Sequence, residues 1–172
     1  WEGPEGLNRA MRELKTVPQL MQAAKTYGAE KILQKIGFNK IAEGDFYNAA
    51  QTIYGALEMA SIMKSMGMSP RNAGHIEKFF RDLRSGHGIE LVANADNINA
   101  IRGIAKRLGM DPNEIQQGDK VKMSGFHGGN ITNFEAQRYV TKKAEYGAST
   151  EQYGYAHVKI ATPEGLKEEW RK

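Results

Sequence analysis

Apolar residues recur every three to four positions through the first two thirds of the chain, and this spacing predicts amphipathic helices. Glycines and Ser, Thr or Asp caps interrupt the pattern and mark where each helix begins or ends. We therefore expect a compact body of five to six helices. The expected helices are a short one after Pro4, then 16–36 with an interruption at Gly28, 45–66, 69–85, 96–108 and a short one from Asp111.

After Gly118 the pattern changes from helical spacing to alternation. Residues 120–123 and 155–161 place apolar and polar side chains at alternate positions, which predicts two short strands. Residues 89–93 fit either a strand or an extended link. Because an isolated two-stranded hairpin is only marginally stable, the two C-terminal strands must pack on the helices or on another chain.

Helix-start signals also occur in this C-terminal part. Thr132-x-x-Glu135 fits a capping box and predicts a helix that continues to about Tyr146. Thr162-Pro163 resembles a cap followed by proline at the first helical position, which predicts a final short helix.

These elements predict a mainly α fold class, with the multi-helix body joined to a small C-terminal α+β tail that contains a two-stranded element. The expected division is a helical body over 1–117 and an α+β tail over 118–172. The tail is expected to pack on the body or on a neighbouring subunit.

Composition removes several classes of function. The 172 residues include no cysteine, which excludes disulfide scaffolds, thiolate metal sites and thiol catalysis. The four histidines lack metal-ligand spacing, so no metal and no cofactor is expected. No apolar run approaches the length of a membrane span and no targeting signal is seen. We expect no membrane insertion and a location in the cytoplasm or within a virion-like assembly.

The charge balance is mildly basic, with 24 Lys and Arg against 20 Asp and Glu. The excess is concentrated in residues 61–122, which carry ten basic and seven acidic side chains, a net charge of +3. Solvated helix faces explain such a distribution, and so does a surface that binds a polyanion.

One segment in this basic third, Ile101–Ile115, resembles the core of a helix-turn-helix. Ala105, Gly109 and Ile115 stand where that motif needs a small residue, a left-handed turn and an apolar lock. Gly118 departs from the motif, because an apolar residue is usual there. The same Gly-Met-Ser/Asp-Pro turn also precedes residues 71–85. An ordinary corner between two packed helices would carry these features as well.

If the resemblance reflects nucleic-acid binding, the candidate contacts are the basic and amide side chains of the two segments. These candidates are Arg71, Lys78, Arg81, Arg84, Arg102, Lys106, Arg107, Asn113 and Gln116.

A glycine-rich stretch between a predicted strand and a predicted helix is a second candidate site. Backbone N–H groups at such a position favour an anion. The candidate anion-binding residues are Ser124, Gly125, His127, Gly128 and Gly129. The stretch lacks the Gly-Lys-Ser/Thr of a nucleotide-binding loop, and a flexible connection or an assembly loop is the alternative interpretation.

No catalytic constellation emerges, and the leading hypothesis is a non-enzymatic structural or assembly subunit that acts through protein–protein contacts. Eight methionines and an aromatic C-terminal part suit adaptable packing surfaces. The expected partners are further copies of the chain or a larger virion-like or nucleoprotein assembly. The first alternative is a nucleic-acid-binding protein that uses the 101–117 corner and the basic helix 70–85. The second is a small enzyme or anion-binding protein that uses the loop 124–132.

Overall fold

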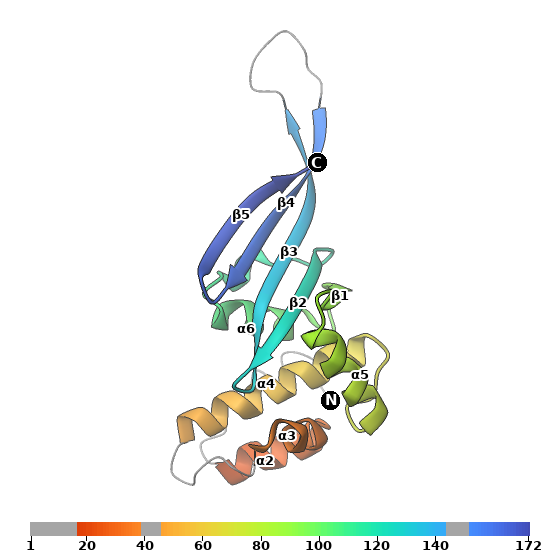
Figure 1. Ribbon diagram of the computed structural model, residues 1–172, viewed down its shortest axis with the longest axis vertical. Coiled ribbons are helices and arrows are strands. Elements are labelled where there is room, and N and C mark those ends of the chain that lie inside the picture. The colour runs from red at the N-terminus through yellow and green to blue at the C-terminus, as the bar shows by residue number, and fades with distance from the viewer. Residues whose placement is uncertain (1–16, 39–45, 144–151) are drawn as a thin grey trace.

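The computed structural model describes residues 17–38, 46–143 and 152–172, which form a layer of helices and an elongated antiparallel sheet (Figure 1). The helices are α2 (Val17–Thr26), α3 (Glu30–Ile36), α4 (Phe46–Ser65), α5 (Ala73–Arg84), α6 (Ile98–Arg107) and the short 3-10 helix η2 (Pro112–Glu114). The strands are β1 (Ile89–Val92), β2 (Lys120–His127), β3 (Asn130–Lys143), β4 (Gln152–Thr162) and β5 (Gly165–Arg171). The helix expected after Pro4 lies outside the described residues.

Helix α4 is the centre of the helical layer. From Ala56 to Met63 every side chain is buried, and a helix that is apolar nearly all round must be covered on all sides. Helices α2 and α3 pack on one side of α4, and α6 packs on another (Figure 1). The expected helix 16–36 is divided into α2 and α3 at Gly28, whose φ of +81° suits glycine.

The sheet runs in the order β1-β2-β3-β4-β5, with every neighbouring pair antiparallel. Helix α5 packs against β1 and β2, and α6 contacts β3. From there β3 and β4 continue away from the helices as a long hairpin (Figure 1).

Side chains alternate between two faces of this sheet. We call one the packed face, because its positions in β1, β2 and β3 belong to the buried core; they are Ile89, Val121, Met123, Phe134 and Ala136. We call the other the charged face, after its members Glu90, Lys120, Lys122, Glu135, Lys167, Glu169 and Arg171. The packed-face residues and the apolar residues of α2 to α6 form one cluster, so the core is continuous across residue 117.

The predicted fold class is wrong, because the chain has a five-stranded sheet where a two-stranded element was expected. The helix expected from Thr132 to about Tyr146 is largely strand β3. Thr132 and Glu135 fit a capping box, but Phe134 and Ala136 alternate with polar residues and lie on one face of the sheet.

The final helix expected from Thr162 is strand β5. Thr162 and Gly165 are paired across a two-residue turn. Proline after the first turn residue and glycine at the fourth are as typical of a β-turn as Thr-Pro is of a helix start. The segment 89–93, left between strand and link, contains strand β1 at the sheet edge.

Candidate functional site

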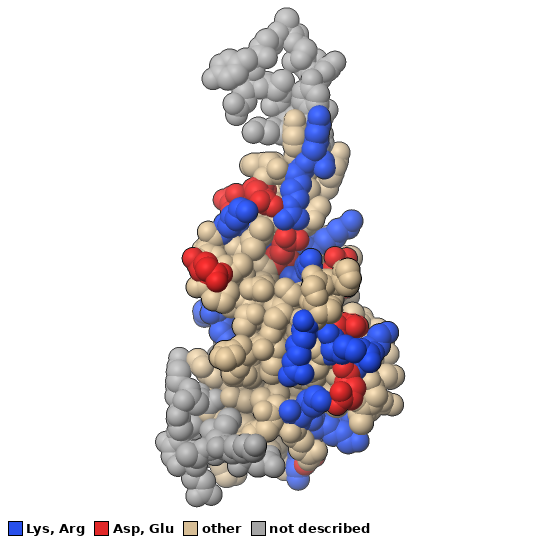
Figure 2. Space-filling view, in the orientation of Figure 1, with Lys and Arg blue, Asp and Glu red and all other residues tan. Residues whose placement is uncertain are grey.

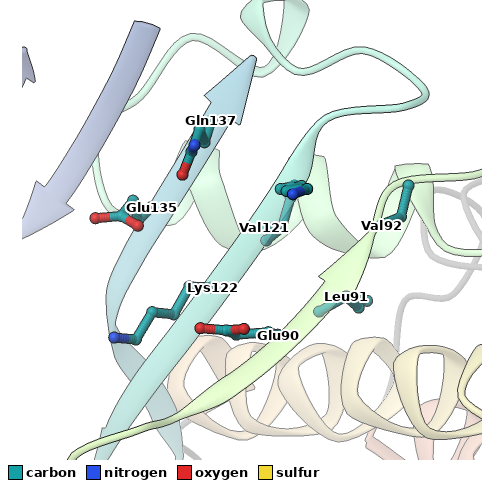
Figure 3. A pocket seen from close by; sticks show the side chains of 8 residues that line it. Glu90, Leu91, Val92, Val121, Lys122, Glu135 and Gln137 are labelled. Atoms are coloured by element: carbon teal, nitrogen blue, oxygen red, sulfur yellow. The ribbon is translucent and has the colours of Figure 1, made fainter. Parts of the chain in front are cut away.

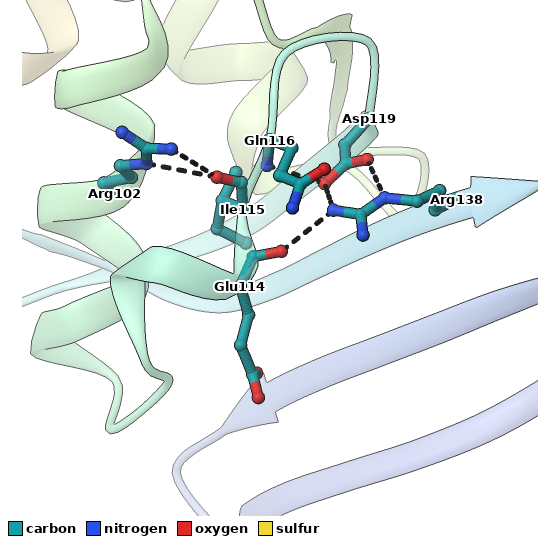
Figure 4. Close-up of polar contacts among 6 residues, drawn as sticks. All are labelled: Arg102, Glu114, Ile115, Gln116, Asp119 and Arg138. Carbon is teal, nitrogen blue, oxygen red and sulfur yellow. Dashed lines mark hydrogen bonds and ion pairs between the residues drawn. The ribbon is translucent and has the colours of Figure 1, made fainter.

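The helix-turn-helix-like segment lacks a second helix of useful length. Helix α6 is followed by η2, which has only three residues. The guanidinium of Arg102 donates from Nε and Nη2 to the carbonyl oxygen of Ile115, at 3.1 and 2.7 Å (Figure 4). Asn113 and Gln116 are exposed, and their backbone N–H groups donate to nearby aspartates. The segment is therefore a tight corner braced by Arg102. Of its candidate cations Lys106 is exposed, whereas Arg102 and Arg107 are half-buried.

Arg107 is half-buried, and its guanidinium contacts two other elements of the fold. Its Nη2 lies 2.5 Å from Oε1 of Glu58 on α4, and its Nη1 donates to Oδ1 of Asn130 at 3.1 Å. Burial raises the pKa of Glu58 to about 7, although Arg107 acts in the opposite direction. Arg107 therefore ties α4 to the β2–β3 hairpin.

The glycine-rich stretch is the tip of that hairpin. Gly128 and Gly129 form a two-residue turn with φ of 60° and 84°, and such turns favour glycine at both positions. Gly129 is buried against α4, where a Cβ on Gly55 would lie 3.2 Å from the Gly129 carbonyl oxygen. His127 is exposed, while Ser124 and Gly125 are half-buried within β2. The stretch packs against a helix instead of preceding one.

The basic candidates on α5 and its preceding turn remain at the surface. Arg71, Lys78, Arg81 and Arg84 are all exposed, and Figure 2 shows Lys and Arg side chains gathered with a few acidic ones at the lower right, over α5. Two of the four also have structural contacts. Arg71 donates to carbonyl oxygens at the end of α2, and the Arg84 guanidinium lies 5.8 Å from the centroids of two phenylalanine rings.

A further polar cluster, which the sequence did not reveal, joins the helical layer to the sheet. The buried carboxylate of Asp119 accepts from Nε and Nη2 of Arg138 on β3, at 2.7 and 2.8 Å (Figure 4). The same guanidinium donates to the carbonyl oxygen of Glu114 at 3.0 Å. Hydrogen bonding to Asp119 raises the pKa of Arg138, so the guanidinium stays charged. Arg102 and Arg138 thus hold the segment 112–119 from opposite sides.

Strand β4 contributes two more contacts with carboxylates beside this cluster. Lys159 Nζ lies 2.8 Å from Oε1 of Glu114, and His157 is paired with Glu168 of β5. The His157 ring stacks on Trp170, with centroids 4.4 Å apart. A cavity of about 280 Å³ lies among these groups. The pairs Arg138–Asp119 and Lys159–Glu114 each join opposite charges, which is the arrangement of a structural network.

A shallow groove of about 370 Å³ crosses the charged face of the sheet (Figure 3). Glu90, Lys122 and Glu135 stand in register on adjacent strands, so their charges alternate across the groove. Glu135 also accepts from Arg171 Nη2 at 3.0 Å. Opposite charges in neighbouring strands stabilise strand pairing.

Exposed apolar side chains are concentrated on the sheet. Five large apolar residues in the described part of the chain are well exposed: Met66 (40%), Val92 (52%), Tyr139 (74%), Leu166 (59%) and Trp170 (49%). Four of these five lie on strands, and three of the four belong to the edge strands β1 and β5. A period-two interpretation of 134–140 and a turn at 162–165 would have located Tyr139, Leu166 and Trp170 from the sequence.

The described residues include no group of three His, Asp or Glu side chains that could hold a metal ion. None of the described helices has the length and hydropathy needed to cross a membrane. Comparison with known proteins found no matching family model, no matching curated protein and no matching solved structure.

Proposed function

We propose that the chain is a non-enzymatic structural or assembly subunit that acts through protein–protein contacts made by its sheet. The observation that carries this proposal is the concentration of exposed apolar side chains on the sheet, where Val92, Leu166 and Trp170 lie on the edge strands. Edge strands offer unpaired N–H and C=O groups to another chain. Apolar side chains beside such an edge add the buried area that a contact needs.

The arrangement of the charged groups favours the same function. Arg102, Arg107 and Arg138 make contacts that hold helices and strands together. The hairpin tip at Gly129 is occupied by α4. Several of the sequence features that suggested a nucleic-acid or phosphate site in 101–130 are thus used in contacts between the helices and the sheet.

Light scattering across a range of protein concentrations tests the proposal. We expect the wild-type chain to form species larger than a monomer. Lysine substitution at Val92, Tyr139, Leu166 or Trp170, tested one at a time, should identify strands that make the contact by lowering the association. Met66→Lys is the matched control, since Met66 is exposed but lies just beyond α4. A wild-type monomer at every concentration, or variants that all behave like the control, would refute the proposal.

A second function has one specific observation in its favour, the four exposed cations Arg71, Lys78, Arg81 and Arg84. A row of cations along a helix can neutralise phosphates, and binding should then weaken steeply with salt. We expect Arg81→Glu to reduce binding to random-sequence DNA or RNA if this surface is used. Lys120→Glu, exposed on the sheet beside Val92 and Gln137, is the control. Binding that is absent, or that does not depend on salt, would exclude this function for α5.

A further inference from the structure

Strand β5 is an edge strand with a regular pattern of side chains. It pairs with β4 on one side, and in the described chain no strand lies on the other side. By register, Leu166, Glu168 and Trp170 share the packed face, whereas Lys167, Glu169 and Arg171 share the charged face. The two exposed apolar residues are therefore placed symmetrically about Glu168, two positions to either side.

The charged side chains have the same symmetry. Lys167 precedes Glu168 and Glu169 follows it, so opposite charges lie at equal distances from the centre. A strand with this arrangement is complementary to itself when it runs antiparallel to its own copy.

We propose that β5 pairs antiparallel with β5 of a second copy, about a two-fold axis that passes beside Glu168. This inference rests on the proposed assembly function and names the partner and the surface. In this register Leu166 stands opposite Trp170 of the second copy, and Lys167 stands opposite Glu169 of the second copy. Each contact occurs twice because the interface is isologous.

The pleat of the sheet restricts the alternatives. Directly opposed residues in an antiparallel pair share a face, and a two-fold axis normal to the sheet keeps the packed faces on one side. In every allowed register, even-numbered residues therefore lie opposite even-numbered residues, and odd-numbered residues lie opposite odd-numbered ones. Moving the register by one step toward Lys167 places two Lys167 side chains opposite each other. Moving it toward Glu169 opposes two Glu169 side chains and brings Lys167 opposite Arg171, and like charges in opposition are destabilising.

Residue 168, which lies beside the two-fold axis, stands opposite residue 168 of the second copy. Two Glu168 side chains face each other at the axis, and each is 60% exposed beside His157 of its own chain. This one like-charge contact is offset by the two contacts between Lys167 and Glu169, which neither alternative register makes. His157 also stacks on Trp170, and both side chains lie on the same face of the sheet as Leu166. The pairing would join five strands from each copy into one sheet. The helices, which pack near β1 to β3, lie toward the far ends of that sheet (Figure 1).

Single cysteines test the register directly, because the chain has none of its own. In the proposed pairing the two copies of residue 168 are neighbours, with Cα atoms about 4.5–5.5 Å apart, within the range that a disulfide bridges. We expect Glu168→Cys to give a covalent dimer on mild oxidation of the otherwise intact chain. Leu166→Cys is the matched control, because residue 166 would lie about 13 Å from its own copy. Equal cross-linking of both variants, or of neither, would overturn the register.

Exchange of charge gives an independent readout. Lys167→Glu places two acidic pairs across the axis and Glu169→Lys places two basic pairs, so each variant alone should associate about tenfold more weakly. Mixing the two variants restores both opposite-charge pairs, and a heterodimer should form at the wild-type concentration. If each substitution only destabilised its own chain, mixing the two variants would not restore association. If the wild-type chain associates but neither the rescue nor the Glu168→Cys dimer appears, this inference fails while the assembly function stands. If the wild-type chain never associates, both fail.

Discussion

The two ends of one sheet differ in what covers the same face. On β2 and β3 the packed-face residues Val121, Met123 and Phe134 are at most 1% exposed, since they belong to the core shared with the helices. On β5 the residues of that face, Leu166 and Trp170, are about half exposed. Apolar side chains occupy this face at both ends, although on β5 Glu168 stands between Leu166 and Trp170. The presence or absence of a packed helix therefore decides whether a side chain stabilises the fold or remains accessible to a partner.

The largest effect should come from the covered end. Phe134→Ala removes a fully buried ring from the core and should lower the free energy of unfolding by about 3–5 kcal/mol. Tyr139→Ala, on the same strand but 74% exposed, should change it by less than about 0.5 kcal/mol. Urea denaturation measures both. Similar losses of free energy of unfolding for the two variants would contradict the proposed difference in packing between the two ends of the sheet.

The next effect concerns the junction between the two ends, where Asp119 is buried and Arg138 is partly exposed. Arg138→Ala leaves a buried carboxylate without its charged partner and should lower the free energy of unfolding by about 2–3 kcal/mol. Asp119→Ala leaves a guanidinium that can turn toward solvent, so the loss should be smaller. Thermal unfolding of the two variants compares them. Equal losses would mean that solvent also reaches Asp119.

An effect of similar size should depend on pH and arise in the helical layer. The pKa of Glu58 is held near 7 by burial, above the ordinary value of 4.5, so the folded chain retains a proton that the unfolded chain has already released. The free energy of unfolding should therefore fall as the pH rises from about 4.5 to about 7, by on the order of 3 kcal/mol. Glu58→Gln removes this titration and should flatten the profile. Parallel profiles for the wild type and the variant would exclude Glu58 as the source.

Local signals explain why the helices were predictable and two of the strands were not. The apolar spacing of α4 and α6 and the glycines that follow them act within one or two turns, so the sequence alone identifies them. Thr132-x-x-Glu135 lies near the start of β3, and Thr162-Pro163 lies at the turn that precedes β5. Both fit the start of a helix equally well. Only pairing with β2 and β4 decides between the two structures, and that pairing is not encoded locally.

The contacts of the candidate site were even harder to predict from local sequence signals than strands β3 and β5. Glu58 and Arg107 are 49 residues apart, and Asp119 and Arg138 are 19 apart. Their partners depend on how the sheet stands on the helices. The number of cations in 61–122 can therefore be read from the sequence. The contacts that Arg102 and Arg107 make with other groups of the fold cannot. The α5 cations were predictable as exposed because they follow the polar side of an amphipathic helix.

The smallest expected change in the free energy of unfolding concerns Leu166 on β5. It also distinguishes most clearly between the covered and the exposed end of the sheet. Leu166→Thr replaces an exposed side chain on β5 with another residue that suits a strand, so the free energy of unfolding should change by less than about 0.5 kcal/mol. The measurement belongs in the Lys167→Glu background, where self-association is already weakened and cannot contribute to the apparent stability. Light scattering on Leu166→Thr alone should instead show weaker association than the wild type. A large loss of stability in the weakly associating background would place Leu166 in the core of the single chain, and β5 would then be a covered strand like β2 and β3.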